Sequence, residues 1–253
     1  GNADNILFFF FSRLKDEFNL LFNAIFSNPE DCKKIIRLLA KKHVGFTREE
    51  IAKETGLPFG GGLTDTLNAL VESDFIQRYR PYNVSGKVSF YKLIDHFSLF
   101  WLKYVEPNTE DINFMTDNMT SNIMRVWRGV AFEEVCWQHI GQIKRALGIS
   151  GVSSSISAWS VKGNDNKEGV QIDLLIIRND NVVNLCEMKF AGDIYSIDKE
   201  EDAKIRNRIQ TLINTLSPKQ SVHLTMITTY GVSHTMYGGR VQQQVILDDL
   251  FQS

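Results

Sequence analysis

The sequence lacks the features that mark several common functional classes. Its 28 lysines and arginines are outnumbered by 30 aspartates and glutamates, which leaves a formal net charge of −2 at neutral pH. That balance argues against a basic coat for nucleic acid, so any affinity for DNA has to come from local patches. The pattern Gly-x4-Gly-Lys-Ser/Thr does not occur in the sequence. We therefore expect that this chain does not bind ATP through a phosphate-binding loop of that kind.

The sequence also has few cysteines, no histidine motif typical of a metal site and no long apolar run. The three cysteines, Cys32, Cys136 and Cys186, are far apart in apolar surroundings, and the five histidines show no spacing typical of zinc ligands. We expect reduced cysteines in a protein core and a cytoplasmic location. The apolar run Ile6–Phe11 is too short to span a bilayer and lacks the features of a signal peptide. We expect no association with a membrane.

Phenylalanine, by contrast, is abundant near the start of the chain. Phe18, Phe22 and Phe26 recur at helical spacing together with Leu21 and Ile25, which predicts an amphipathic helix. This helix is expected to pack on the domain that follows it. The alternative is that its apolar face contacts a neighbouring domain that this chain does not include.

Helix-start and strand signals divide the first hundred residues into three helices and a hairpin. Asn28-Pro29-Glu30-Asp31 combines an N-cap, a first-position proline and acids, and Thr47-Arg48-Glu49-Glu50 is a capping box. Gly60-Gly61-Gly62 precedes a third helix with a leucine stripe. Phe75–Arg80 and Lys87–Leu93 then predict two strands with a turn between them. Three helices and a hairpin form the pattern of a winged helix-turn-helix domain.

The predicted third helix is poorly suited to reading DNA. It carries Asp65, Glu72 and Asp74 and no lysine or arginine, whereas a recognition helix normally offers basic or amide side chains. The basic residues of this domain's predicted hairpin are candidates for phosphate contacts, although a solvated hairpin has the same composition; they are Arg78, Arg80 and Lys87. A contact with protein, or one with DNA led by the wing, is therefore favoured over direct sequence readout.

Two apolar segments in the second half of the chain contain carboxylates. Gln171–Ile177 and Val182–Lys189 are rich in β-branched residues, and the Asn-Asp-Asn sequence between them is typical of a turn. A hairpin centred on Asp180 would place Asp173 directly opposite Glu187 on the same sheet face, where like charges repel. The lysine that ends the second segment returns to that face. A divalent cation would offset the repulsion further.

This arrangement resembles the PD-(D/E)XK nuclease superfamily, whose signature is an acid on one strand and (Asp/Glu)-x-Lys on the next. Asp173 matches the first acid and Glu187-Met188-Lys189 matches the second element, while Ile172 stands where the signature has proline. The superfamily also carries a glutamate on a preceding helix. Within Val130–Trp137 its small-x-Phe-Glu pattern selects the first of two glutamates, Glu133. The predicted order of helix, three strands, helix and strand agrees with the superfamily core.

The resemblance implies hydrolysis of DNA phosphodiesters with Mg²⁺ or Mn²⁺, ions that prefer oxygen ligands, activate water and clamp phosphate. The residues that it assigns to the site are Asp173, Glu187 and the Met188 carbonyl as metal ligands, with Glu133 assisting and Lys189 nearest the attacking water. The predicted helix Asp198–Leu216 adds Arg206 and Arg208, which could meet phosphate or belong to a solvated face. The alternative to a working site is a plain cluster of charges at the open edge of a hairpin.

From Leu14 to its end the chain is also similar to the C-terminal portion of archaeal-type ATPases of the AAA/STAND kind. The matching segments are Leu14–Phe18, Phe46–Ala52, Tyr91–Asp95, Gly129–Glu133 and Leu185–Lys189. The resemblance implies a winged helix and a nuclease-like domain that normally follow an ATPase module, which is missing from this chain. The partners that it implies are that module and DNA.

We therefore expect an α+β protein with two domains. A winged helix-turn-helix domain would occupy residues 1–106, a linker residues 107–122, and an α/β restriction-endonuclease-like domain residues 123–253. The acid, acid and lysine set favours a Mg²⁺-dependent DNA nuclease that belongs to the ATPase. The alternative is an inactive nuclease fold that acts, together with the winged helix, as a regulatory or protein-interaction module of the ATPase.

Overall fold

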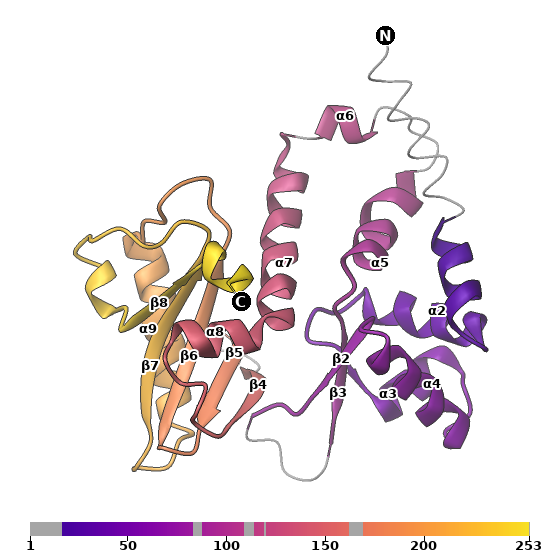
Figure 1. The fold of residues 1–253 in the computed structure, drawn as a ribbon, viewed down its shortest axis with the longest axis horizontal. Helices are drawn as coiled ribbons and strands as arrows, with labels where there is room; N and C mark the ends of the chain where they lie inside the picture. The colour runs from indigo at the N-terminus through magenta and orange to yellow at the C-terminus, as the bar shows by residue number, and fades with distance from the viewer. Residues whose placement is uncertain (1–16, 83–87, 109–113, 119, 162–168, 253) are drawn as a thin grey trace. The chain divides into compact units, whose positions relative to one another are not determined.

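The computed structural model describes residues 17–82, 88–108, 114–118, 120–161 and 169–252 (Figure 1). The chain divides into two compact units, residues 1–78 with 88–131, and residues 79–87 with 132–253. Helices and a β-sheet occur in both units, so the predicted α+β class is confirmed. The division differs from the predicted linker over residues 107–122, because helix α7 (Asn122–Gln138) contributes to both units.

The first helices of unit 1 begin where the sequence signals predict, although only one of the two predicted caps forms. A helix over residues 17–25 precedes α2 (Pro29–Leu39), which begins at the predicted proline. The side chain of Asn28 makes no cap bond to the α2 backbone and donates instead to the Asp31 carboxylate, at 2.6 Å. The predicted capping box of α3 (Arg48–Thr55) is confirmed, because the Thr47 and Glu50 side chains each accept the other residue's backbone N–H. The other helical elements of this unit are α4 (Gly61–Glu72), α5 (His96–Phe100), a π-helical turn (Trp101–Val105), a 3-10 turn (Glu106–Asn108) and α6 (Phe114–Asn118).

A small sheet completes unit 1, with strand order β1 (Phe46–Thr47), β3 (Phe90–Leu93), β2 (Ile76–Tyr79). Strand β1 enters this sheet directly after Gly45, whose φ is +74°. A Cβ at that glycine would lie 2.0 Å from the Tyr91 carbonyl oxygen, so no other residue fits there without moving the backbone. The predicted hairpin turn lies mostly outside the described residues, and so does Lys87.

The phenylalanines of the first helix lie in the core of unit 1. Phe18 and Phe22 are 1% and 0% exposed, and Phe26, which follows the helix, is also buried. Phe22 contacts Phe75 with ring centroids 5.1 Å apart, and Phe18 stacks on Trp101 at 6.0 Å. This burial confirms that the helix packs on the domain that follows it, because its apolar face is filled by residues of the same unit.

Unit 2 is built on a five-stranded mixed sheet in the order β4-β5-β6-β7-β8 (Figure 1). The elements are the end of α7, α8 (Ile140–Ala146), β4 (Ser154–Val161), β5 (Val170–Arg178), β6 (Val182–Lys189), α9 (Lys199–Ile213), β7 (Ser221–Thr228) and β8 (Gln243–Ile246). Two 3-10 turns, Gly238–Arg240 and Leu247–Phe251, flank β8. Strands β4, β5 and β6 are antiparallel, whereas β7 and β8 run parallel to β6. The predicted order of helix, three strands, helix and strand is confirmed.

The β5–β6 hairpin has the predicted register. Leu174 pairs with Cys186 and Ile177 with Val183, so the two strands are symmetric about Asp180. The turn closes through Asn181, which adopts a left-handed φ of +67° that asparagine tolerates better than most residues. Local turn chemistry therefore determines which residues of these two strands face each other.

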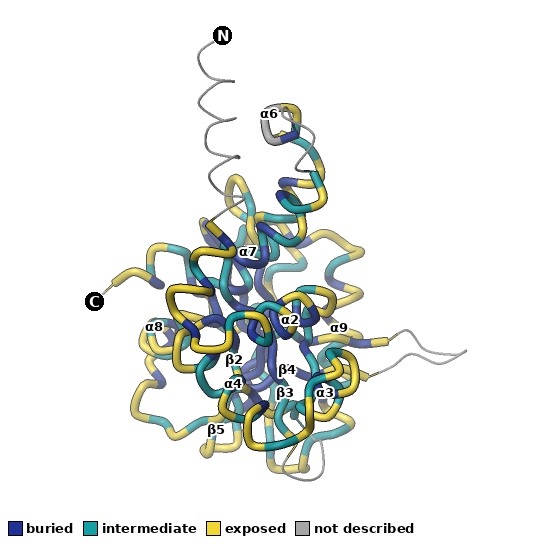
Figure 2. Tube along the Cα trace, turned by 90° about the vertical axis from the view of Figure 1, so that its right-hand side faces the viewer, coloured by how far each residue is buried: buried dark blue, intermediate teal, exposed yellow. Residues whose placement is uncertain are grey.

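The two faces of the unit 2 sheet are covered by different helices. Ile205 and Leu212 of α9 belong to one buried cluster with Leu185 of β6. On the other face Cys136 of α7 is buried near Cys186, and burial followed by that neighbouring thiol raises the pKa of Cys136. Buried residues, dark blue in Figure 2, concentrate in the strands and the inner turns of the helices, and exposed residues, yellow, in the outer loops.

All three cysteines are free thiols and buried, as predicted. Among the described residues, none of the helices combines the length and apolar character that a membrane crossing requires. The cytoplasmic location stays a prediction.

The core position of the first helix generates a stability test. We expect Phe22→Ala to lower the free energy of unfolding of unit 1 by about 3–5 kcal/mol, because a fully buried ring leaves a cavity. Leu20 lies on the same helix and is 62% exposed, so Leu20→Ala should change it by no more than about 0.5 kcal/mol. Urea unfolding followed by circular dichroism measures both variants, and equal effects would contradict the packing described.

Candidate functional site

A β-bulge in β5 determines where the first predicted acid points. Ser157 of β4 pairs with Leu175, but Trp159, two residues on, pairs with Ile172, three residues back, so β5 contains one extra residue at this point. Ile172 and Leu175 both belong to the buried cluster beneath α9. The extra residue therefore leaves Asp173 on the opposite sheet face, the one covered by α7.

The carboxylate of Asp173 lies beside the predicted helix glutamate. Oxygen atoms of Asp173 and Glu133 are within 4.8 Å of each other. The Gln171 side-chain amide donates to Asp173 Oδ1 at 2.6 Å. The neighbouring Glu134 is fully buried, whereas Glu133 is half-buried, so the carboxylate that approaches Asp173 is the more accessible of the two. The sequence pattern selected this same glutamate.

A buried tyrosine completes this acidic side of the sheet. Tyr79 is 6% exposed, and its ring lies 5.6 Å from that of Trp137 on α7. Burial raises the pKa of the Tyr79 hydroxyl, and the negative charges of Asp173 and Glu134 raise it further. The phenol therefore stays protonated at any physiological pH, so it can donate a hydrogen bond and adds no negative charge.

The second motif forms a separate ion-pair network on the α9 side of the sheet. Glu187 is buried, and its carboxylate lies 2.9 Å from Lys189 Nζ and 3.3 Å from Arg208 Nη1. Lys189 Nζ is also 3.0 Å from the Glu201 carboxylate. Both Glu201 and Arg208 belong to α9. Two acids and two cations therefore balance one another at this position.

Burial and ion pairing have opposite effects on the acid and the lysine of this network. Burial raises the pKa of Glu187 above its usual value, and the cations of Lys189 and Arg208 oppose that rise only in part. For Lys189, burial lowers the pKa, but the carboxylates of Glu187 and Glu201 outweigh it and raise the pKa well above its usual value. Lys189 is thus held as an ammonium group at neutral pH.

The structure corrects the prediction that Asp173 and Glu187 share one sheet face. Asp173 and Glu187 are the residues next to the last paired residues, Leu174 and Cys186, so they lie at the same position along the hairpin, as predicted. The bulge, however, turns Asp173 toward α7, whereas Glu187 points toward α9. Gln171 links the two groups: its side chain donates to Asp173, and its carbonyl accepts from Arg208 Nε at 3.2 Å. The repulsion between the two acids is relieved by this separation and by ion pairs.

The two acids flank the point where strands β5 and β6 separate. The described pairing of the hairpin ends at Leu174–Cys186. Beyond it β6 continues along β7 as far as Lys189, and β5 continues along β4 as far as Val170. The oxygens of Asp173 and Glu187 therefore lie just beyond the last described pair of the hairpin.

The predicted nucleic-acid contacts are dispersed. Arg206 Nε lies 3.0 Å from the buried Asp202 carboxylate, whose other oxygen accepts from Arg240 Nε at 2.8 Å, so these arginines join α9 to the 3-10 turn before β8. Arg208 belongs to the Glu187 network. Arg78 and Arg80 are exposed, but they fall in different units. Met188 has a buried side chain, so only its backbone carbonyl could serve as a metal ligand.

Sequence reasoning missed two contributors, Gln171 and Glu201. Gln171 reads as an ordinary strand residue, and Glu201 as one of several acids in the first turn of a helix capped by Asp198. Glu201 meets Lys189, 12 positions away, and the Gln171 carbonyl meets Arg208, 37 positions away, because α9 packs across β5 and β6. A local pattern carries no signal for such a contact.

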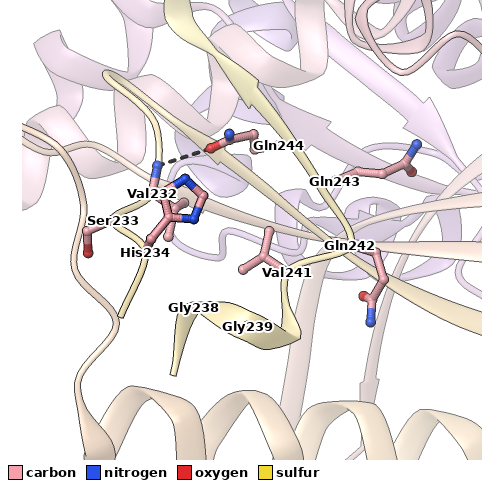
Figure 3. A pocket seen from close by; sticks show the side chains of 9 residues that line it. All are labelled: Val232, Ser233, His234, Gly238, Gly239, Val241, Gln242, Gln243 and Gln244. Atoms are coloured by element: carbon pink, nitrogen blue, oxygen red, sulfur yellow. Dashed lines mark hydrogen bonds between the residues drawn. The ribbon is translucent and has the colours of Figure 1, made fainter. Parts of the chain in front are cut away.

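Unit 2 also contains a cavity beside β8 (Figure 3). It measures about 230 Å³ and is lined by the loop Val232–His234, the glycines of the 3-10 turn and the glutamines of β8. Gln244 accepts from the Val232 backbone N–H at 3.2 Å, and Gln243 accepts from the buried Asn184 at 2.8 Å. Its described lining contains no carboxylate, so it is less suited to a hard cation than the fork of β5 and β6.

Comparison with known proteins identifies no family. No protein-family model matches the chain, and no curated protein is detectably similar in sequence. A solved crystal structure of a protein of unknown function, AF1548, is 17% identical with a TM-score of 0.31. The match covers 44% of this chain and 56% of that one, so this chain spans about half the length of that structure. The class defined by the fold is an α+β protein with a five-stranded mixed sheet.

The raised pKa of Glu187 generates a test of linkage. A folded-state pKa above the unfolded value means that this group favours folding in acid and that the contribution is lost as pH rises through its folded pKa. Glu187→Gln removes that titration. We expect the stability of Glu187→Gln relative to wild type to increase as pH rises from about 4 to about 7.5. Urea unfolding at several pH values measures the difference, and a constant difference would contradict a raised pKa.

Proposed function

We propose that unit 2 is a metal-dependent nuclease domain of the PD-(D/E)XK type that hydrolyses DNA phosphodiesters. One observation carries the proposal: Asp173 and the Glu187-Met188-Lys189 motif flank the fork of β5 and β6, and a Glu133 oxygen lies within 4.8 Å of Asp173. The order of elements in this unit, helix, three strands, helix and strand, supports the same assignment. Fold alone does not decide activity, so the assignment depends on the residues of the site.

The residues at the fork fit Mg²⁺ or Mn²⁺ by their chemistry. Asp173 and Glu133 offer hard oxygen ligands on the α7 side, and Glu133 is partly accessible to solvent. Glu187 is a further candidate, but its carboxylate is already paired with Lys189 and Arg208. A bound ion would lower the pKa of a water molecule and neutralise phosphate charge. Asp173 and Glu133 are therefore the residues that we expect to hold it first.

Lys189 is suited to orienting groups rather than to accepting a proton. A general base near neutral pH needs a pKa close to the working pH, and the two carboxylates beside Lys189 raise its pKa away from that range. Its ammonium group can donate hydrogen bonds to a water molecule or to a nonbridging phosphate oxygen. We infer that Lys189 supplies positive charge and orientation at the scissile phosphate.

For unit 1 we propose a winged helix-turn-helix that serves the ATPase module implied by the sequence resemblance. Helices α2, α3 and α4 followed by β2 and β3 support this reading. The first turn of α4 contains no acidic residue and its last turn no basic one, and the helix as a whole carries acids without lysine or arginine. That charge favours contact with protein over insertion into a DNA groove.

One observation favours the alternative function, an inactive nuclease fold that regulates the ATPase. Glu187, Lys189, Glu201 and Arg208 neutralise one another in the structure. A network of that kind can also be a purely structural solution for a buried acid. Metal binding separates the two functions, because a regulatory module has no need of a metal at the fork.

The metal proposal predicts the behaviour of two variants. Asp173→Ala should abolish Mn²⁺ binding in calorimetry and lower Mg²⁺-dependent cleavage of DNA by at least about 100-fold, and Lys189→Ala should lower cleavage similarly while retaining metal binding. Asp180→Asn is the matched control, because Asp180 lies at the other end of the same hairpin and pairs with Arg178. Cleavage by Asp173→Ala at the wild-type rate would contradict the proposal, and a wild-type protein that binds no metal would support the regulatory alternative.

A further inference from the structure

A large polar cavity lies against the outer face of α9 in unit 2. It measures about 810 Å³ and is an open groove between α9 and the beginning of β5. The lining residues of α9 recur every three or four positions, which places them on a single helix face. The polar or charged lining residues in the middle of α9 are Lys204, Asn207, Arg208, Gln210 and Thr211, and Gln171 of β5 lies across the groove from them. We call this cavity the α9 groove.

Two walls of the α9 groove touch the acids of the proposed catalytic site. Arg208 contacts the Glu187 carboxylate at 3.3 Å, and Gln171 donates to the Asp173 carboxylate at 2.6 Å. Arg208 also donates to the Gln171 carbonyl at 3.2 Å, so the two walls are joined. A molecule in the groove would therefore lie one side chain away from Glu187, whereas Asp173 lies on the opposite sheet face.

The chemistry of the groove is that of a site for a polar, negatively charged chain. Its described lining contains no aromatic side chain, whereas small-molecule pockets are mostly apolar and aromatic. Lys204 and Arg208 are one helical turn apart, and the one lining acid, Glu200, pairs with Lys204 at 2.7 Å. A phosphate in the groove therefore competes with Glu200 for Lys204, as it does with Glu187 for Arg208. Asn207 and Gln210 have amide groups, which both donate and accept hydrogen bonds, whereas Gln171 meets Arg208 through its backbone carbonyl.

We propose that the α9 groove binds a single-stranded segment of nucleic acid next to Glu187. Lysine and arginine bind phosphates without regard to sequence, and amide side chains pair with base edges, which a single strand leaves open. The volume suits a few nucleotides of one strand, since pockets of about 300–1,000 Å³ hold ligands of that order. The delivery of a phosphodiester to the acids rests on the proposed nuclease function, whereas binding itself does not.

Occupation of the groove also bears on the ion-pair network. A phosphate beside Arg208 competes with Glu187 for the same guanidinium group, which prefers bidentate anions of this kind. Glu187 then keeps only Lys189 as a partner and becomes available to a cation. The strand and the metal are therefore expected to favour each other's binding.

The experiment measures binding without metal, so that cleavage plays no part. A labelled 12-nucleotide single strand is titrated with full-length protein in EDTA, and fluorescence anisotropy gives the Kd for wild type and for the double variant Lys204→Ala/Asn207→Ala. Both side chains are exposed, so folding should be retained, and circular dichroism checks this. We expect at least about a tenfold increase in Kd and a shallower salt dependence, because one phosphate contact is lost.

Two controls make the result specific to the groove. Lys219→Ala removes an exposed lysine of equal charge that follows α9 and does not line the cavity, so its Kd should stay within about twofold of wild type. A duplex of the same sequence should bind at least about tenfold more weakly than the single strand. A double variant that binds like wild type, a duplex that binds as tightly, or an equal loss in Lys219→Ala would each overturn the proposal.

A parallel Mg²⁺ cleavage assay separates this proposal from the nuclease proposal. Single-strand binding that the double variant loses, without cleavage by wild type, would support the groove and contradict the nuclease. Cleavage and binding that are both unchanged in the double variant would support the nuclease and overturn the groove.

Discussion

The burial of the Glu187 carboxylate in β6 is the constraint on which the rest of unit 2 depends. A buried carboxylate needs cations or hydrogen bonds to compensate for lost hydration. Lys189 comes from the same strand face, but Arg208 comes from α9, which must therefore cross the sheet at one register. Glu201 then balances the second cation. These ion pairs, together with the buried Ile205 and Leu212, hold α9 over the sheet and so determine the groove along its outer face.

The bulge in β5 solves a related problem. Without it, the register of the hairpin would hold two carboxylates opposite each other on one sheet face, where like charges destabilise the pair. With it, Asp173 turns toward Glu133 and away from Glu187, and the two acids keep a common position at the end of the paired strands. The Gln171 side chain donates to Asp173, and its carbonyl accepts from Arg208, which in turn pairs with Glu187. Charge is thus distributed over both sheet faces around a single fork.

Prediction from the sequence succeeded where the determining interactions are local. The capping box at Thr47, the proline start of α2 and the β5–β6 register all depend on residues within about ten positions of one another. It was wrong on the face of Asp173 and did not find Gln171 or Glu201. The hydropathy pattern of β5 does not reveal a bulge, because Ile172, Leu174 and Leu175 are all buried and fit either register.

By itself, the sequence determined the α+β class, the order of elements in unit 2 and the pairing of Glu187 with Lys189 at the end of one hairpin, because periodicity and turn residues act over short distances. Only the tertiary structure decided that Asp173 faces α7, that Lys189 is shared between two carboxylates, and that Arg206 binds Asp202 while Arg208 reaches Glu187. Those outcomes depend on how α9 packs across the sheet. Side chains two positions apart on a helix point in different directions, so their partners are set by what lies beneath each one.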